Sequence, residues 1–297
     1  MKRHLFPAAV LLLALFFIRC IQANDLPAGE LEVVHRKENR FDCTFEGIKH
    51  GFILDLPEKS EGAPLVLLLP GYGNTAESFR LTTHFEQDAN PLGYAVAYVT
   101  GARDPNNPIG SVGWNSGISP EGNDDTAFLT SLAEYLQQEY SFDRERTFAV
   151  GFSNGAFMAH RLAMEAGDTF SACVSVAGMM PAKIWQNRND TNDISFFQIT
   201  GEKDDVVPKN SDGSAAYSKN PAIEDVMAYW ASSDGLDISE SDQTANGSVL
   251  TKHQSDEKPD QVWDLMIKNG RHSWPDVKMT GIDANRLILE FFDTVSH

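Results

Sequence analysis

Short uninterrupted apolar runs recur along the chain and alternate with segments in which apolar residues have helical spacing. Runs of this kind are typical of strands buried on both faces of a sheet. Strands alternating with helices predict an α/β domain with a mainly parallel central sheet and helices on both faces. The expected strands cover 64–69, 94–100, 147–150, 173–177, 194–200, 249–253 and 261–267, after an antiparallel entry within 31–56. The expected helices cover 76–89, 221–234 and 282–294, and two more carry the apolar positions within 128–136 and 157–164.

The stretch 147–163 combines a strand, a tight turn and a helix, with Ser153 at the turn. This is the context of a nucleophile elbow, whose sharp turn requires small residues beside the serine. Gly151 and Gly155 supply them. The pattern G-x-S-x-G alone should occur by chance in about one chain in ten of this length. A simple glycine-rich loop is therefore the alternative that the rest of the chain must decide.

An α/β-hydrolase needs an acid and a histidine, in the chain order serine, acid, histidine. Asp204 and Asp205 both follow the strand at 194–200, where the acid is expected. Three histidines come later: His253 lies in or at the end of a strand, His297 is the last residue, and His272 lies in the loop before the last helix. The position of His272 makes it the expected base.

Two backbone N–H groups should form the oxyanion hole of such an enzyme. We expect one from Asn154 and the other from Tyr72, in the glycine-rich loop after the strand at 64–69. Trp114, in the long polar stretch 101–124, could stack on a substrate or could pack the loop. Trp274 is a second candidate substrate-binding residue, with packing as its alternative. Other residues have structural interpretations: His160 as a packed or surface histidine, and Asp124 and Asp125 as helix caps.

Several motifs together resemble a family of secreted esterases that includes feruloyl esterases, acetylxylan esterases and polyhydroxybutyrate depolymerase-like proteins. They are PGYGNTAESF at 70–79, GWN at 113–115, NDDTAFLTSL at 123–132, GFSNGAFMAHRLA at 151–163, SVAGMMP at 175–181, TGEKDDVVP at 200–208 and GRHSWP at 270–275.

The resemblance implies an α/β-hydrolase fold and a triad of Ser153, Asp204 and His272, which prefers Asp204 over Asp205. The chain departs from the family where Pro70 and Thr200 replace a histidine. It departs again where Ala156 replaces a glycine after Ser-Asn-Gly. No triad residue is affected, but substrate preference could be.

The N-terminus has the composition of a targeting signal. Lys2, Arg3 and His4 precede the apolar run 5–18, which is short for a membrane span. We interpret 1–23 as a cleaved signal peptide, with a lipoprotein anchor at Cys20 as a weaker alternative, and 24–297 as a single catalytic domain. Loss of 1–23 would change the formal net charge from −18 to −21. Such a surface disfavours nucleic acids, anionic membranes and strongly acidic polymers as partners.

The remaining cysteines, Cys43 and Cys173, fall in separate parts of the expected sheet and are predicted to be buried free thiols. No Cys/His spacing suggests a metal site, and no cofactor is expected. Asn189 and Asn246 begin glycosylation sequons.

The expected activity is serine ester hydrolysis through an acyl-enzyme. The rate should fall at acid pH, because a protonated His272 cannot act as a base. The expected substrate is an ester, as in feruloylated or acetylated plant cell-wall polysaccharide, and the expected location is periplasmic or extracellular. The alternatives are a polyhydroxyalkanoate depolymerase and an inactive hydrolase fold that binds a ligand. Oligomeric state is left open.

Overall fold

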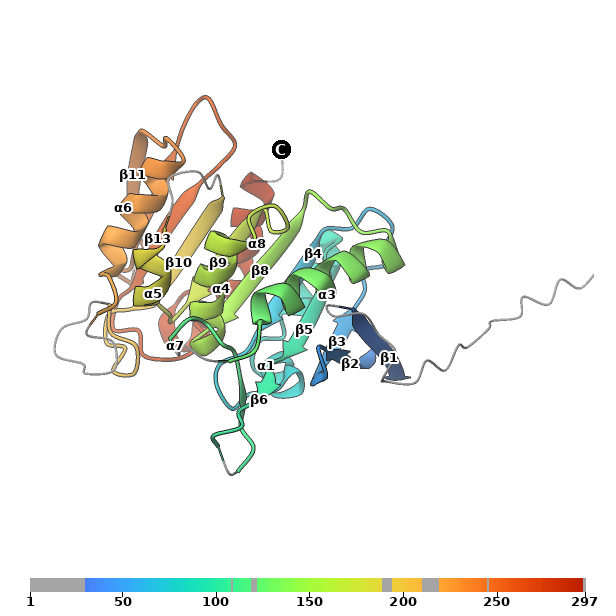
Figure 1. The fold of residues 1–297 in the computed structure, drawn as a ribbon. Coiled ribbons are helices and arrows are strands. Elements are labelled where there is room, and N and C mark those ends of the chain that lie inside the picture. Colours follow the sequence, from blue (N-terminus) through green and yellow to red (C-terminus); the bar gives the residue numbers. More distant parts are fainter. Residues whose placement is uncertain are drawn as a thin grey trace, which may run out of the picture.

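The computed structural model describes residues 30–107, 109–118, 122–188, 194–209, 219–244 and 246–295. The expected signal peptide, the sequon at Asn189 and His297 lie outside these ranges. The described residues form one eleven-stranded sheet, in the order β1-β2-β3-β5-β4-β8-β9-β10-β13-β12-β11 (Figure 1). Its strands are β1 Leu31–Lys37, β2 Arg40–Phe45, β3 Ile48–Asp55, β4 Leu65–Leu69, β5 Ala95–Thr100, β8 Thr147–Phe152, β9 Ala172–Val176, β10 Ser195–Gly201, β11 Ile238–Gln243, β12 Val249–Gln254 and β13 Val262–Ile267.

The six central strands from β5 to β13 are parallel, while the strands at both edges are antiparallel. The sheet is therefore mainly parallel, as predicted. The chain runs from β4 to β5 on one side and later returns to β8 on the other side of β4. Ligands of open α/β sheets bind at the carboxyl ends of strands where the order reverses in this way. The fold thus points to the ends of β4 and β8, at Leu69 and Phe152.

Helices cover both faces of the sheet, as predicted (Figure 1). One apolar core packs α3, α4, α5 and α6 on one face, and a second packs α1, α2 and α8 on the other. The helices are α1 Ala76–Thr83, α2 Phe85–Ala89, the 3-10 turn η1 Asn90–Leu92, α3 Asp125–Tyr140, α4 Asn154–Glu165, α5 Ala182–Gln186, α6 Ile223–Ser233, α7 Val277–Thr280 and α8 Ala284–Thr294. No helix in the described ranges is long and apolar enough to cross a membrane.

Two local expectations need correction. The single helix expected over 76–89 is broken at His84, whose positive φ of 46° ends α1 and begins α2. The stretch 101–124 is not wholly irregular, because β6 Ala102–Arg103 pairs with β7 Val112–Gly113 in a hairpin. Figure 1 shows this hairpin projecting from the sheet edge at which β8 ends.

The two cysteines of the described chain are free and buried, as predicted. Cys43 lies on β2 and Cys173 on β9, five strand positions apart. At about 4.8 Å per position the two are about 24 Å apart, far beyond disulfide reach.

Candidate active site

Ser153 occupies a strained turn between β8 and α4. Its backbone has φ 52° and ψ −116°, a combination that residues other than glycine rarely adopt. The turn is held because the Ser153 N–H donates to the Val176 carbonyl at 3.0 Å, and the Ser153 carbonyl accepts from the first turn of α4. This geometry places the hydroxyl at the carboxyl edge of the sheet, as a nucleophile elbow requires.

Steric contacts with the backbone require glycine at positions 151 and 155, on either side of Ser153. A Cβ on Gly151 would lie 1.9 Å from the Gly155 carbonyl oxygen, and a Cβ on Gly155 would lie 2.0 Å from the Leu69 carbonyl oxygen. Neither position can hold a side chain unless backbone moves. The helix α4 therefore packs directly against the end of β4, and this brings the loop after β4 next to Ser153.

The structure brings Ser153, His272 and Asp204 together from three separate loops. His272 Nε2 lies 2.9 Å from Ser153 Oγ, and His272 Nδ1 lies 2.8 Å from Asp204 Oδ2. A carboxylate only accepts hydrogen bonds, so Nδ1 carries the proton, and Nε2 of the neutral ring accepts from the serine hydroxyl. Asp205 is exposed instead. The arrangement can transfer the serine proton to the imidazole.

The carboxylate of Asp204 is fixed on both of its oxygens. Oδ1 accepts from the backbone N–H groups of Val206 and Val207 at 2.9 and 2.8 Å, which leaves Oδ2 for the histidine. Its side chain is 1% exposed, whereas that of His272 is 16% exposed. The carboxylate of Asp204 is thus shielded from water, while part of the imidazole of His272 is accessible from outside.

A neighbouring carboxylate ties the acid loop to the base loop. Glu202 accepts from the Asn269 backbone N–H at 3.0 Å and from Lys268 Nζ at 2.7 Å. The Lys203 N–H donates to the Gly270 carbonyl at 2.7 Å. These contacts fix the separation of the loops after β10 and β13, and therefore that of Asp204 and His272.

The loop after β4 lies against the elbow. A Cβ on Gly71 would be 3.2 Å from the Ser153 Cβ, so Gly71 permits this approach. Within the described ranges, the backbone N–H groups of Tyr72 and Asn154 donate to no protein acceptor. Two free donors beside the serine are what an oxyanion hole needs. The hydroxyl of Tyr72 donates to Asp104 Oδ2 at 2.8 Å, which links the loop after β4 to the segment that follows β6.

Trp114 and Trp274, the two candidate substrate-binding tryptophans, are both largely buried, and each donates its indole N–H within the protein. Trp114 is 6% exposed and donates its indole N–H to the Pro70 carbonyl at 3.0 Å. Trp274 is 7% exposed and donates to Asn285 Oδ1 at 3.0 Å. Both indoles anchor site loops: Trp114 the loop after β4, and Trp274 the loop that carries His272.

The side chain of Asn154 connects the elbow to the segment 113–116, a link that sequence reasoning missed. Its Oδ1 accepts from the Trp114 backbone N–H at 2.7 Å, and its Nδ2 donates to the Trp114 carbonyl at 3.2 Å. A cavity of about 310 Å³ adjoins this contact. Its lining combines hydrogen-bonding side chains with apolar ones: Tyr72, Asp104, Asn115, Ser116, Asn123 and Asp125 beside Ala102, Trp114 and Ile118.

Asp125 was expected to cap α3, and this is wrong. Asp124 is the cap, accepting from the Ala127 N–H at 3.1 Å, whereas Asp125 Oδ2 accepts from the Asn115 backbone N–H at 2.6 Å. Asp125 is 1% exposed, and burial raises its pKa to about 6, although Asn115 and Arg161 oppose the shift. His160 is a packed histidine, as expected, stacked on Phe196 at 4.5 Å.

Replacing Asp125 by asparagine is expected to change how stability depends on pH. Because the folded pKa of about 6 lies above the ordinary value of 3.8, the parent loses stability as pH rises from about 4 through 6, whereas an asparagine side chain does not titrate. The variant should therefore gain stability relative to the parent as the pH rises: the difference in the free energy of unfolding, Asp125→Asn minus parent, should be about 1 kcal/mol larger at pH 8 than at pH 5. Urea denaturation of both proteins at both pH values measures this difference. The same difference at pH 5 and pH 8 would contradict a raised pKa of Asp125 in the folded protein.

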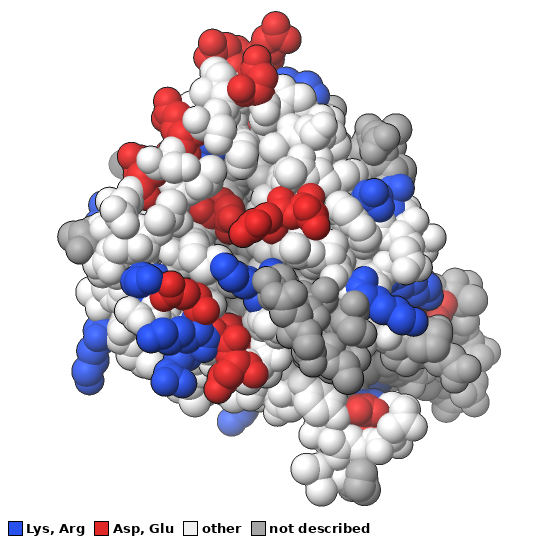
Figure 2. Space-filling model, turned by 90° about the vertical axis from the view of Figure 1, so that its left-hand side faces the viewer, with Lys and Arg blue, Asp and Glu red and all other residues white. Residues whose placement is uncertain are grey.

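The surface is strongly acidic, with 42 Asp and Glu against 24 Lys and Arg in the whole chain. Figure 2 shows the face at the β11 end of the sheet, where acidic side chains gather at the upper tip and in a band across the middle. Among the described residues, no group of three His, Cys, Asp or Glu side chains is placed to hold a metal ion.

Comparisons with known proteins agree with the fold and the site. A family model described as phospholipase/carboxylesterase matches residues 56–222, more than half of the chain. NocK of Nocardia uniformis subsp. tsuyamanensis, which is named as an esterase, is 29% identical over 244 residues, covering 74% of this chain and 67% of that protein. An acetylxylan esterase of Coprinopsis cinerea is 29% identical over 162 residues, covering 52% of this chain and only 40% of its own length.

Among solved structures, an acetyl xylan esterase from Aspergillus awamori superposes with a TM-score of 0.62 at 12% identity, covering 90% of this chain and all of that chain. A carboxylesterase of Bacillus cereus superposes with a TM-score of 0.52 at 17% identity, covering 82% and 93%. At these identities the superpositions establish the α/β-hydrolase fold. The sequence relatives confirm the resemblance to acetylxylan and feruloyl esterases.

Proposed function

The chain belongs to the phospholipase/carboxylesterase family, and from this premise we propose that it is a serine esterase that forms an acyl-enzyme on Ser153. That it is a carboxylic ester hydrolase follows from the family and its relatives. The proposal adds the residues, and one observation carries it: the continuous hydrogen-bonded series from Ser153 Oγ through His272 to Asp204, at 2.9 and 2.8 Å.

The proposed reaction has two steps. Ser153 Oγ attacks the ester carbonyl while His272 Nε2 takes its proton, and the resulting oxyanion is bound by the N–H groups of Tyr72 and Asn154. The tetrahedral intermediate collapses, the C–O bond to the alcohol breaks, and His272 returns the proton to the leaving oxygen. Water, deprotonated by His272, then hydrolyses the acyl-serine and regenerates the enzyme.

We infer that the substrate is an acetyl ester on a hydroxyl-rich polymer such as plant cell-wall polysaccharide. The cavity beside Tyr72 and Asn154 presents hydrogen-bonding side chains next to the apolar Trp114 and Ile118, a combination that suits the hydroxyls and the apolar ring face of a sugar. Feruloyl esters rank second because Trp114, the indole that could stack on an aromatic acyl group, is buried. Curated relatives named as acetylxylan and feruloyl esterases support this order of candidates. The apolar run near the N-terminus supports secretion.

A panel of acetylated xylan, methyl ferulate and polyhydroxybutyrate film tests the proposal. Release of acetate from acetylated xylan should exceed release of product from the other two substrates, and Ser153→Ala should abolish it. Preferred release of hydroxybutyrate would assign a depolymerase instead. No hydrolysis of any ester, with the fold intact by circular dichroism, would overturn the enzymatic function.

A further inference from the structure

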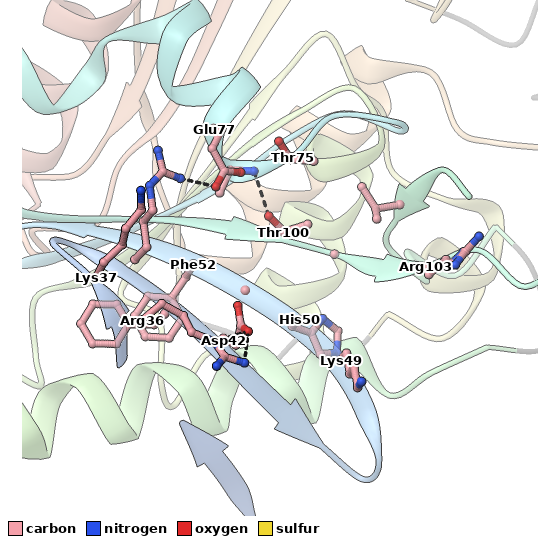
Figure 3. Close-up of a pocket in the computed structure, with 16 residues that line it drawn as sticks. Arg36, Lys37, Asp42, Lys49, His50, Phe52, Thr75, Glu77, Thr100 and Arg103 are labelled. Carbon is pink, nitrogen blue, oxygen red and sulfur yellow. Dashed lines mark hydrogen bonds and ion pairs between the residues drawn. The ribbon is translucent and has the colours of Figure 1, made fainter. Parts of the chain in front are cut away.

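A second hollow, of about 560 Å³, lies on the edge of the sheet away from the triad. Its lining comes from β1, β2, β3, the start of α1, the end of β5, and the β6–β7 hairpin. It includes Arg36, Lys37, Arg40, Lys49 and Arg103. Figure 3 shows Lys37 at one end of the hollow, Lys49 and Arg103 at the other, and Glu77 with Thr100 along one side. We refer to it as the basic groove.

The depth of the groove follows from the pairing of β2, β3 and β5. Gly51 lies between Asp42 on β2 and Thr100 on β5 in register. A side chain at Gly51 would point into the space between these neighbours, and a Cβ there would already lie 3.2 Å from the Phe41 carbonyl oxygen. The glycine leaves a hollow that the basic side chains surround.

The positive charge of the groove is not cancelled locally. Its two acidic side chains each have a partner already: Asp42 pairs with Arg36 at 2.6 Å, and Glu77 pairs with Arg40. Lys37, Lys49 and Arg103 are exposed and form no ion pair with any described residue. Three uncompensated cations around one hollow are notable in a chain of formal net charge −18, because the field of the whole molecule would otherwise repel anions.

The groove and the cavity next to the elbow share one lining residue. Arg103 lines both the basic groove and the cavity that borders Tyr72 and Asn154. The strand order from Ser153 outward is β8, β4, β5, β3. Three strand spacings place β3 about 14 Å from β8. A small ester cannot reach both sites, whereas an extended polymer can.

Building on the proposed esterase function, we propose that the basic groove binds carboxylate groups carried by the polymeric substrate, such as uronic acid units of a polysaccharide. An ester bond of the polymer lies at Ser153 while a carboxylate on a distant unit of the same chain contacts Lys37, Lys49 or Arg103. Arginine pairs with carboxylates through two parallel hydrogen bonds, and lysine acts as a point charge. The negative net charge of the chain predicts that acidic polymers are repelled, but the charge at this one surface is positive.

Matched polymers test the groove: acetylated glucuronoxylan, and the same preparation with its carboxyl groups reduced to alcohols. The parent should have a KM about 3- to 10-fold lower for the carboxylated polymer, since exposed ion pairs each contribute up to about 1 kcal/mol. Lys37→Gln/Lys49→Gln should lose this preference. Its rates on the reduced polymer and on p-nitrophenyl acetate should match those of the parent. The preference should also shrink between about 0.05 M and 0.5 M salt.

The control variant Lys59→Gln/Lys278→Gln removes the same charge from exposed positions outside the groove. It should keep the preference. Equal KM values for the two polymers in the parent would overturn the proposal that the groove binds carboxylates. An equal loss of the preference in both double variants would overturn it as well.

Binding of Ser153→Ala to deacetylated glucuronoxylan, measured by affinity electrophoresis, separates this inference from the esterase function. Retardation that requires Lys37 and Lys49 would support the groove even if no ester were cleaved. Ester cleavage without such retardation would leave the esterase standing and refute the groove.

Discussion

Ser153→Ala is expected to lower kcat/KM for p-nitrophenyl acetate by at least about 10⁴-fold, because the serine oxygen is the atom that becomes acylated. The alanine keeps the Cβ of Ser153 and leaves the backbone hydrogen bonds of the elbow in place. The free energy of unfolding should therefore stay within about 1 kcal/mol of the parent. Initial rates and urea denaturation of the same preparations measure both quantities.

Ser239→Ala is the matched control, since Ser239 is exposed on β11, five strand positions from β8. It should leave activity and stability unchanged. If Ser153→Ala retained activity within about tenfold of the parent, the nucleophile would have to be another residue, whatever the geometry at His272.

Gly155→Ala is expected to have the largest effect on folding. The added Cβ would lie 2.0 Å from the Leu69 carbonyl oxygen and 2.8 Å from that of Pro70, and both obstacles are backbone. Either β4 or α4 must move, at a cost of more than about 3 kcal/mol out of a total of about 5–15 kcal/mol. We expect insoluble protein, or soluble protein with a lower urea midpoint and displaced Tyr72 and Ser153, and thus little activity.

Gly167→Ala controls for the loss of a glycine as such. A Cβ on Gly167 would meet only the Ala163 carbonyl oxygen, at 3.9 Å, an ordinary contact. Its stability should change by less than about 1 kcal/mol. A Gly155→Ala protein as stable and active as Gly167→Ala would show that α4 does not pack against β4 as described.

Much of the centre of the fold could be predicted because its signals are local. Buried parallel strands such as β4 and β10 are continuous apolar runs, and their boundaries agree with the expected ones within about two residues. The order of Ser153, acid and His272 along the chain identified which loops meet. The choice of Asp204 over Asp205 needed the family resemblance, and the structure explains it: two backbone N–H groups hold Asp204 toward the histidine.

The parts that could not be predicted depend on contacts between distant segments. Trp114 is of a residue type that often stacks on ligands, but its indole N–H donates to the carbonyl of Pro70, which is 44 positions away in sequence. Asp125 lies where a helix cap is expected, yet its side chain accepts a hydrogen bond from the backbone N–H of Asn115. The net charge of the chain does not reveal the basic groove, because Lys37, Lys49 and Arg103 surround one hollow only when β1, β3 and β6 are assembled.

The central claim, that Ser153 is the nucleophile activated by His272, is tested most directly by covalent labelling. The protein is treated with diethyl p-nitrophenyl phosphate, which transfers a phosphoryl group to an activated serine, and is then analysed by intact mass and peptide mapping. We predict a single adduct on Ser153, absent in Ser153→Ala and formed far more slowly in His272→Ala. An adduct on a different residue, or unchanged labelling of Ser153→Ala, would contradict the account.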